Sequence, residues 1–166
     1  DLYDTTPSGE PDSAGIGYFG LMGAGMWGTA NILGNMQGSS PAHFCAWSKI
    51  ENGWVDPQVV SNTTALHVNL YESASDNYNV VKVPIDSKNY YLLENRNYNG
   101  YDKGLFSLNG FFRGGMALWK INESVIESSR SLNMVNSDVE NKGVDLIEAN
   151  RASLDDSVYE HGHEKA

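Results

Sequence analysis

Glycine crowding in the first 39 residues is the feature that most limits how this chain folds. Nine of its 17 glycines lie there, and Pro7 and Pro11 interrupt any regular period further. Glycine disfavours helix and strand interiors because its backbone is too free, and proline lacks a backbone donor. Residues 1–39 are therefore expected to form a long irregular loop, and such loops in compact domains usually carry function.

Regular structure is expected only after residue 39. Ser40-Pro41 has the composition of a helix start, hydrophobic residues follow near helical spacing, and Asn52-Gly53 marks an end. This pattern predicts one short helix.

Extended segments dominate the rest of the chain. They are rich in Val, Tyr, Leu and Thr, are separated by Asn, Asp and Ser, and cover 54–60, 64–72, 78–84, 88–96 and 114–121. A short helix or turn opened by Asn122 and an apolar segment at 142–149 follow. The expected fold class is α+β, with an irregular glycine-rich loop, one short helix and a mostly antiparallel β-rich region. We expect one domain over 1–155 and a frayed tail at 156–166.

Charge and cysteine content exclude several classes of function. The chain has 166 residues with 21 acidic and 11 basic side chains, a net charge of −10, so nucleic acid is not an expected partner. The single Cys45 permits neither an internal disulfide nor a cysteine metal cluster, and a buried thiol is expected there. No apolar run reaches the length of about 18 residues that a membrane-spanning helix needs.

Six segments occur in an order that resembles the immune inhibitor A family of secreted bacterial zinc metallopeptidases, and the similarity spans nearly the whole chain. These segments are DLYDT, GIGYFGLMGAGMWG, SPAHFCAWSKIENGWVDP, YYLLENR, GGMALWKINESVI and NKGVDLIEAN. In that family a helix bearing H-E-x-x-H-x-x-G-x-x-D runs into D-L-Y-D-T, and a glycine-rich loop then reaches an L-M-x-x-G-x-W stretch.

The resemblance implies a function. The chain would be the C-terminal portion of the catalytic domain of a secreted, metzincin-like zinc endopeptidase that hydrolyses peptide bonds in proteins. Asp1 would end the zinc signature, and the missing N-terminal half would supply two histidines and the catalytic glutamate. No catalytic residue is then expected in this chain, which alone should be inactive. Lys120 departs from the family, which often has His in this strand, and argues against a metal role there.

Two carboxylates compete as the third zinc ligand that the resemblance implies. Asp1 stands at the signature position, although it could instead be an acidic loop residue or a calcium ligand together with Asp4. Glu94 in YYLLENR is the alternative ligand, and its competing interpretation is an ion pair with Arg96. Met22 would form the methionine turn, an apolar floor beneath the histidines, unless it is an ordinary core methionine.

Other polar residues have weaker claims. Asp1, Asp4, Glu10 and Asp12 carry the hard oxygens that calcium prefers, but no D-x-D-x-D-G loop is present, so solvated acids are the competing interpretation. The tail pair His161 and His163 is expected to be solvent-exposed. His43 and His67 are expected to be surface or core histidines.

One non-enzymatic function stays open beside the protease. The same segments could belong to an independently folding, β-rich binding or adhesion module. An H-E-x-x-H motif immediately upstream of Asp1 in a longer chain would favour the protease, whose expected partner is a protein or peptide substrate. A secreted location is implied by the resemblance alone.

Overall fold

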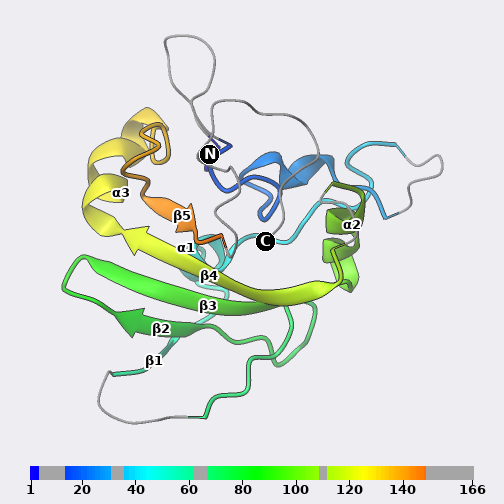
Figure 1. Ribbon diagram of the computed structural model, residues 1–166, viewed down its shortest axis with the longest axis horizontal. Helices are drawn as coiled ribbons and strands as arrows, with labels where there is room; N and C mark the ends of the chain where they lie inside the picture. The colour runs from blue at the N-terminus through cyan, green and yellow to red at the C-terminus, as the bar shows by residue number, and fades with distance from the viewer. Residues whose placement is uncertain (4–13, 31–35, 62–66, 109–111, 149–166) are drawn as a thin grey trace.

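One five-stranded sheet organises the molecule. The computed structural model describes residues 1–3, 14–30, 36–61, 67–108 and 112–148. The strands stand in chain order, β1 (Gln58–Val59), β2 (Val81–Pro84), β3 (Asn89–Asn97), β4 (Gly114–Asn122) and β5 (Val144–Leu146). β1 pairs with β2 in parallel, and the other neighbours are antiparallel (Figure 1). The predicted α+β class with a mostly antiparallel sheet is confirmed.

Strict alternation in the two long central strands produces the buried face. Successive side chains of a strand point to opposite faces, so every second residue of β3 is buried: Tyr90, Leu92, Glu94 and Arg96. The antiparallel register sets Leu92 against Trp119 and Glu94 against Ala117 of β4. The buried face is therefore apolar at one end and charged at the other.

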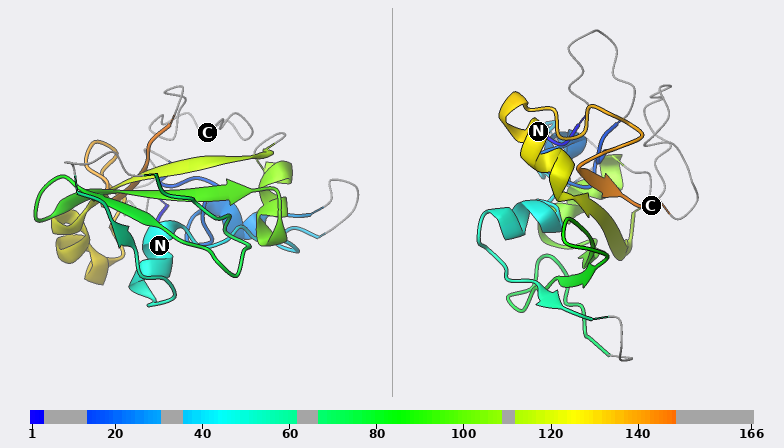
Figure 2. Two further views of the ribbon diagram at one scale, coloured as in Figure 1. Left: turned by 90° about the horizontal axis from the view of Figure 1, so that it is seen from below. Right: turned by 90° about the vertical axis from the view of Figure 1, so that its left-hand side faces the viewer.

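The glycine-rich segment and α1 (Ala46–Glu51) cover this face of the sheet. Figure 2 shows both on the same side of β3 and β4. Ile16 and Ala46 are fully buried and belong to one hydrophobic core with Leu92 and Trp119 of the sheet. Burial of this apolar surface is the main favourable contribution to the stability of the layered arrangement.

Short helices flank both ends of the sheet. The 3-10 helix η2 (Gly100–Gly104) leads into α2 (Leu105–Leu108), which the sequence did not predict. At the other end β4 continues into α3 (Glu123–Ser129), followed by η3 (Arg130–Leu132). Asn122 caps α3 by accepting hydrogen bonds from the backbone N–H groups of Ser124 and Val125, as its position predicts.

The predicted start of α1 after Ser40 is wrong, because the helix begins only at Ala46. Residues 40–43 are held in other hydrogen bonds: Ser40 N–H donates to Gly28 O and Ala42 N–H to Gly25 O. His43 N–H donates to the Asp102 carboxylate, and His43 O accepts from Leu21 N–H. Contacts with distant loops therefore replace the first helical turn.

The predicted strands at 54–60 and 64–72 are mostly absent from the described chain. Only Gln58–Val59 of the first is strand, and 67–71 contain none, while 62–66 lie outside the description. Side-chain amides satisfy this backbone instead: Tyr71 N–H donates to Asn79, and Asn95 donates to Leu70 O. Polar side chains 8 and 25 residues away therefore take the place of sheet partners here.

Gly15 shows why the opening segment needs glycine. Its φ of +63° is rare for L side chains, and a Cβ there would lie 2.1 Å from Leu2 O. The close approach lets Ile16 N–H donate to Leu2 O at 3.0 Å. The described part of the predicted loop, which contains the short 3-10 helix η1 (Ala24–Trp27), is thus hydrogen-bonded to the first residues of the chain.

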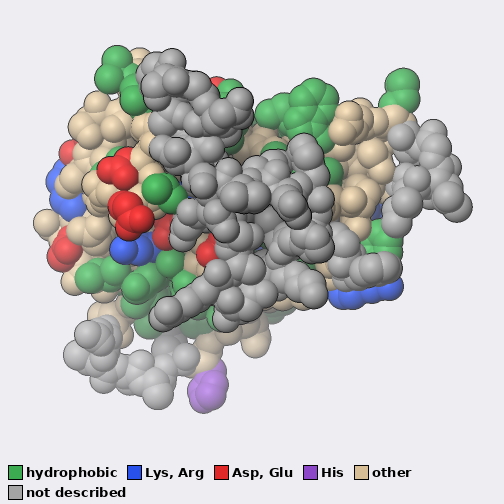
Figure 3. All heavy atoms as spheres, turned by 45° about the horizontal axis from the view of Figure 1, so that its top comes forward, with side chains coloured by type: hydrophobic (Ala, Val, Ile, Leu, Met, Phe, Trp, Pro, Cys, Tyr) green, Lys and Arg blue, Asp and Glu red, His purple; other side chains and the backbone are tan. Residues whose placement is uncertain are grey.

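On the face in Figure 3, Lys and Arg side chains stand among acidic and hydrophobic ones. Within the described ranges, no helix is long and apolar enough to cross a bilayer. The predicted tail at 156–166 lies outside those ranges, and the domain boundary at 155 stays a prediction.

Candidate functional site

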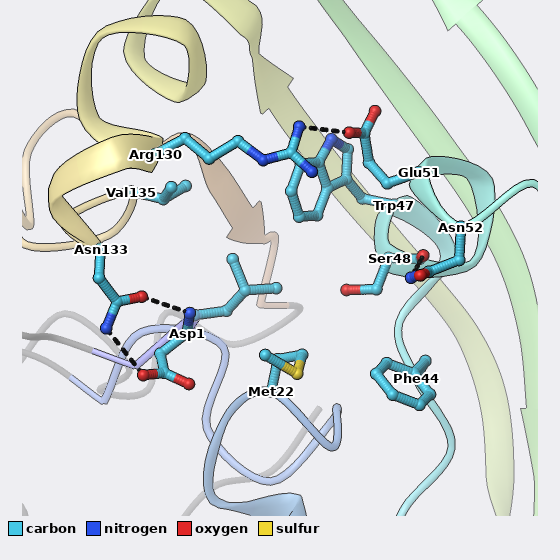
Figure 4. A pocket seen from close by; sticks show the side chains of 11 residues that line it. Asp1, Met22, Phe44, Trp47, Ser48, Glu51, Asn52, Arg130, Asn133 and Val135 are labelled. Atoms are coloured by element: carbon cyan, nitrogen blue, oxygen red, sulfur yellow. Dashed lines mark hydrogen bonds and ion pairs between the residues drawn. The ribbon is translucent and has the colours of Figure 1, made fainter.

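A pocket of about 180 Å³ lies between the chain start, the glycine-rich segment, α1 and η3. Parts of the chain far apart in sequence thus meet at one cavity (Figure 4). Its lining residues are Asp1, Leu2, Met22, Phe44, Trp47, Ser48, Glu51, Asn52, Arg130, Asn133 and Val135. The lining combines an apolar floor with polar groups at opposite ends, as ligand sites do, although the volume is below the roughly 300–1,000 Å³ of a typical ligand pocket.

Asp1 forms one polar end of the pocket. Its carboxylate accepts from Asn133 Nδ2 at 2.8 Å and from the Tyr3 hydroxyl at 3.2 Å. Its amino group donates to Asn133 Oδ1 at 2.6 Å. Asn133 adopts the left-handed conformation with φ of 57°, which asparagine tolerates better than most residues, and this places its amide beside Asp1.

Met22 lies on the pocket floor, and its backbone is hydrogen-bonded to Leu2, the residue after Asp1. Leu2 N–H donates to Met22 O at 2.8 Å, and the half-buried Met22 side chain packs against the hydrophobic core. The next residue, Gly23, donates to Gly20 O, and a Cβ there would lie 2.5 Å from Gly17 O. A tight glycine turn therefore presents this methionine.

Trp47, Glu51 and Arg130 form the other polar end. Arg130 Nη1 donates to Glu51 Oε2 at 2.7 Å, and its guanidinium lies 5.8 Å from the Trp47 ring (Figure 4). The indole Nε1–H of Trp47 is buried and has no hydrogen-bond partner among the described residues. The interpretation of the sequence missed Arg130 and Glu51, because nothing in sequence spacing links residues 79 apart.

A buried ionic cluster lies behind α1. Glu94 Oε1 accepts from Ala46 N–H at 3.2 Å and from Trp119 Nε1–H at 3.0 Å. Its other oxygen, Oε2, accepts from the Tyr78 hydroxyl at 2.6 Å and from Lys49 Nζ at 3.4 Å. Glu94 therefore caps the first residue of α1 from the sheet below.

Arg96 extends this cluster toward the glycine-rich segment. Its Nε and Nη2 donate to the two oxygens of Asp102, each at 2.6 Å, and its Nη1 donates to Phe19 O at 2.7 Å. Arg96 Nη1 also lies 3.3 Å from Glu94 Oε1. One guanidinium thus connects two carboxylates and the backbone that leads to Met22.

The cluster shifts the acidities of its members. Burial alone would raise the pKa of Glu94, but Arg96, Lys49 and the Tyr78 hydroxyl together hold it below its ordinary value. The pKa of Asp102 is lowered in the same way, with burial opposed by Arg96. Burial lowers the pKa of Lys49 despite its carboxylate partner. Both carboxylates are therefore held ionised in the interior.

The predicted site residues fall into separate places. Asp1 and Met22 share the pocket. Glu94 belongs to the buried cluster, where it forms the ion pair with Arg96 that was its competing interpretation. All five donors around Glu94 already occupy its oxygens, so the geometry favours this ion pair over a role as zinc ligand. Lys120 is exposed on β4.

The other residues named from the sequence lie away from the pocket or outside the described ranges. Asp4, Glu10, Asp12, His161 and His163 lie outside the described ranges, so the calcium and tail predictions stay untested. His67 is exposed. His43 is half-buried, its ring lies edge-on to Tyr101, and burial lowers its pKa. Cys45 is a free, buried thiol as expected, and burial raises its pKa.

The described residues offer no ready-made metal site. They contain no group of three or more His, Cys, Asp or Glu side chains that could hold a metal ion. Of the two exposed carboxylates that line the pocket, Glu51 is paired with Arg130, and Asp1 lies at the end where Leu2 N–H donates to Met22 O. It fits a single position in a ligand set.

Comparison with known proteins adds no relative. No protein-family model matches this sequence, and neither a curated protein nor a solved structure gives a match.

Proposed function

We propose that this chain is the C-terminal portion of the catalytic domain of a secreted zinc endopeptidase that resembles the immune inhibitor A family. The observation that supports it is the meeting of Asp1 and Met22 at one pocket, with Leu2 N–H bonded to Met22 O at 2.8 Å. The resemblance implies that Asp1 is a zinc ligand and that Met22 forms the methionine floor. Both roles require them to lie together.

The chain's own residues would do three things in this enzyme. Asp1 would provide one carboxylate ligand, oriented by Asn133 and Tyr3. Met22 would give the ligands an apolar floor, and α1 would form a wall of the substrate cleft. Zinc, when bound by a complete ligand set, supplies Lewis-acid polarisation. One carboxylate is too few for a stable site, so this chain alone should neither hold stoichiometric zinc nor hydrolyse casein.

The decisive test uses a longer chain that includes the residues upstream of Asp1. The proposal requires an H-E-x-x-H motif there, stoichiometric zinc in the purified protein, and casein hydrolysis that a chelator abolishes. A linker or unrelated domain upstream of Asp1, with no zinc in the protein, would instead favour the non-enzymatic binding or adhesion module.

Ligand identity is tested in the same longer chain. Asp1→Ala should abolish zinc and activity together, whereas Glu94→Ala should retain zinc but lower stability, because Lys49 loses its buried partner. Glu140→Ala, an exposed carboxylate, is the matched control. Full zinc in Asp1→Ala with loss in Glu94→Ala would reverse the assignment, and zinc retained in both would place the third ligand upstream.

A further inference from the structure

The Arg130 end of the pocket contains a hydrogen-bond donor without an acceptor. Trp47 is 7% exposed, and its Nε1–H has no partner within the described part of the chain. Buried polar groups in native proteins are nearly always paired, and an unpaired donor lowers stability. An acceptor from outside the described residues would therefore satisfy this indole.

Arg130 offers further donors at the same place. A guanidinium carries five N–H groups, and among the described residues the structure gives Arg130 one carboxylate partner, Glu51. The Arg130 side chain is 60% exposed and that of Glu51 is 30% exposed. An ion pair this exposed contributes little free energy, so an incoming group can exchange with Glu51 at small cost.

We propose that this end of the pocket binds the carboxylate of a peptide, which replaces Glu51 on Arg130 and accepts from Trp47 Nε1–H. In the free protein, the carboxylate of Glu51 occupies the place on Arg130 that the ligand's carboxylate would take. The neighbouring floor of Phe44, Met22 and Leu2 suits the apolar atoms next to that group. A cationic ligand fits less well because it would leave the indole donor unpaired.

The surrounding charges set the expected strength. Asp1 stands at the opposite end of the pocket, Glu51 is beside Arg130, and the chain carries a net charge of −10. These negative charges oppose a second anion, so the affinity of the wild-type chain should be low. Removal of the Glu51 charge should raise it. The identification of the ligand as a peptide rests on the proposed function, whereas the carboxylate chemistry rests on the pocket alone.

Nuclear magnetic resonance of the ¹⁵N-labelled chain tests the proposal without zinc. The chain has four tryptophans, and Trp47→Phe identifies the indole signal of Trp47. The probes are N-acetylglycine, with a terminal carboxylate, N-acetylglutamic acid α-amide, with a side-chain carboxylate, and neutral N-acetylglycinamide. Either carboxylate probe should move the Trp47 indole N–H signal downfield, and the neutral probe should not. The more effective carboxylate tells whether the pocket takes a chain end or an acidic side chain.

Variants at the ion pair make the test specific. Arg130→Gln should weaken carboxylate binding by about tenfold or more, since it removes the charged partner. Glu51→Gln should strengthen it by about two- to fivefold, the range expected for loss of a competing exposed pair. Lys88→Gln, which breaks the exposed ion pair of Lys88 with Glu127 of α3, should leave binding unchanged.

Three results would overturn the inference: no movement of the Trp47 signal with either carboxylate, equal movement with the neutral probe, or weaker binding in Glu51→Gln. The proposed function stands or falls separately, because the zinc content of the longer chain decides it. If carboxylates bind and the longer chain contains no zinc, the carboxylate site is supported and the endopeptidase function is refuted.

Discussion

Two arginine–carboxylate pairs in this molecule have the same chemistry and opposite surroundings. Arg96 and Asp102 have side chains 1% exposed and share two hydrogen bonds of 2.6 Å. Arg130 and Glu51 are 60% and 30% exposed and share one of 2.7 Å. The first pair lies beneath α1 and the second lies at the mouth of the pocket.

The comparison shows that burial determines whether an arginine–carboxylate pair is a fixed structural contact or one that can exchange partners. A charge removed from water is tolerated only when its hydrogen-bonding capacity is nearly filled, and Arg96 meets this with two carboxylates and the Phe19 carbonyl. Such a cluster resists change and holds α1 and the glycine-rich segment on the sheet. Water screens the exposed pair, which can exchange partners.

The largest expected effect is the loss of the buried guanidinium. Arg96→Met leaves two buried carboxylates without their main partner and should lower the free energy of unfolding by about 3–5 kcal/mol. Urea unfolding followed by far-ultraviolet circular dichroism measures it. Arg130→Met is the matched control and should change stability by less than about 1 kcal/mol. Equal effects of the two substitutions would refute the contrast.

The next largest effect is expected from acid, which should lower the free energy of unfolding by protonating the buried carboxylates Glu94 and Asp102. The pKa values of Glu94 and Asp102 are lowered in the folded state, so their stabilisation is present above the unfolded values of about 4.3 and 3.9 and is lost as pH falls through the folded values. Burial lowers the pKa of His43, so stability should already begin to fall below about pH 6.5.

Urea unfolding at a series of pH values measures both steps of this acid dependence. His43→Gln should remove the earlier step and leave the later one. A flat stability profile below about pH 4 would contradict the ionised cluster.

Met22→Ala should have a smaller effect. A buried methionine costs about 2–5 kcal/mol when cut back to alanine, and the half-buried position of Met22 reduces the expected loss to about 1–2 kcal/mol. The melting temperature should fall, and in the longer, zinc-containing chain the zinc stoichiometry should be kept. An unchanged melting temperature would mean that Met22 does not pack against the core.

The smallest effect on stability is expected for a substitution in the exposed pair of Arg130 and Glu51. Glu51→Gln should alter the free energy of unfolding by less than about 0.5 kcal/mol, because a screened pair contributes little. Thermal unfolding of this variant beside Lys88→Gln measures it. A large loss would show that the Arg130–Glu51 pair is structural, and would remove it as an exchangeable contact.

Prediction from sequence succeeded where local chemistry decides the structure. The residue composition of extended segments marked β3 and β4, and Asn122 marked the start of α3. It failed where distant groups compete for the same backbone: Asp102 draws His43 N–H out of the predicted helix, and Asn79 replaces a strand partner at Tyr71. For Glu94 the ion pair with Arg96 was foreseen, but the donors from α1 and β4 were not.

By itself the sequence determined the α+β class and the two central strands, because the residue types that favour a strand and those that end it are neighbours in the chain. Only the tertiary structure decided that Asp1 and Met22 meet at one pocket, that Arg130 reaches Glu51, and that Glu94 is buried among donors. These pairings depend on how the loops pack across the sheet, and burial then determines whether a charged side chain is a fixed support or an exchangeable contact.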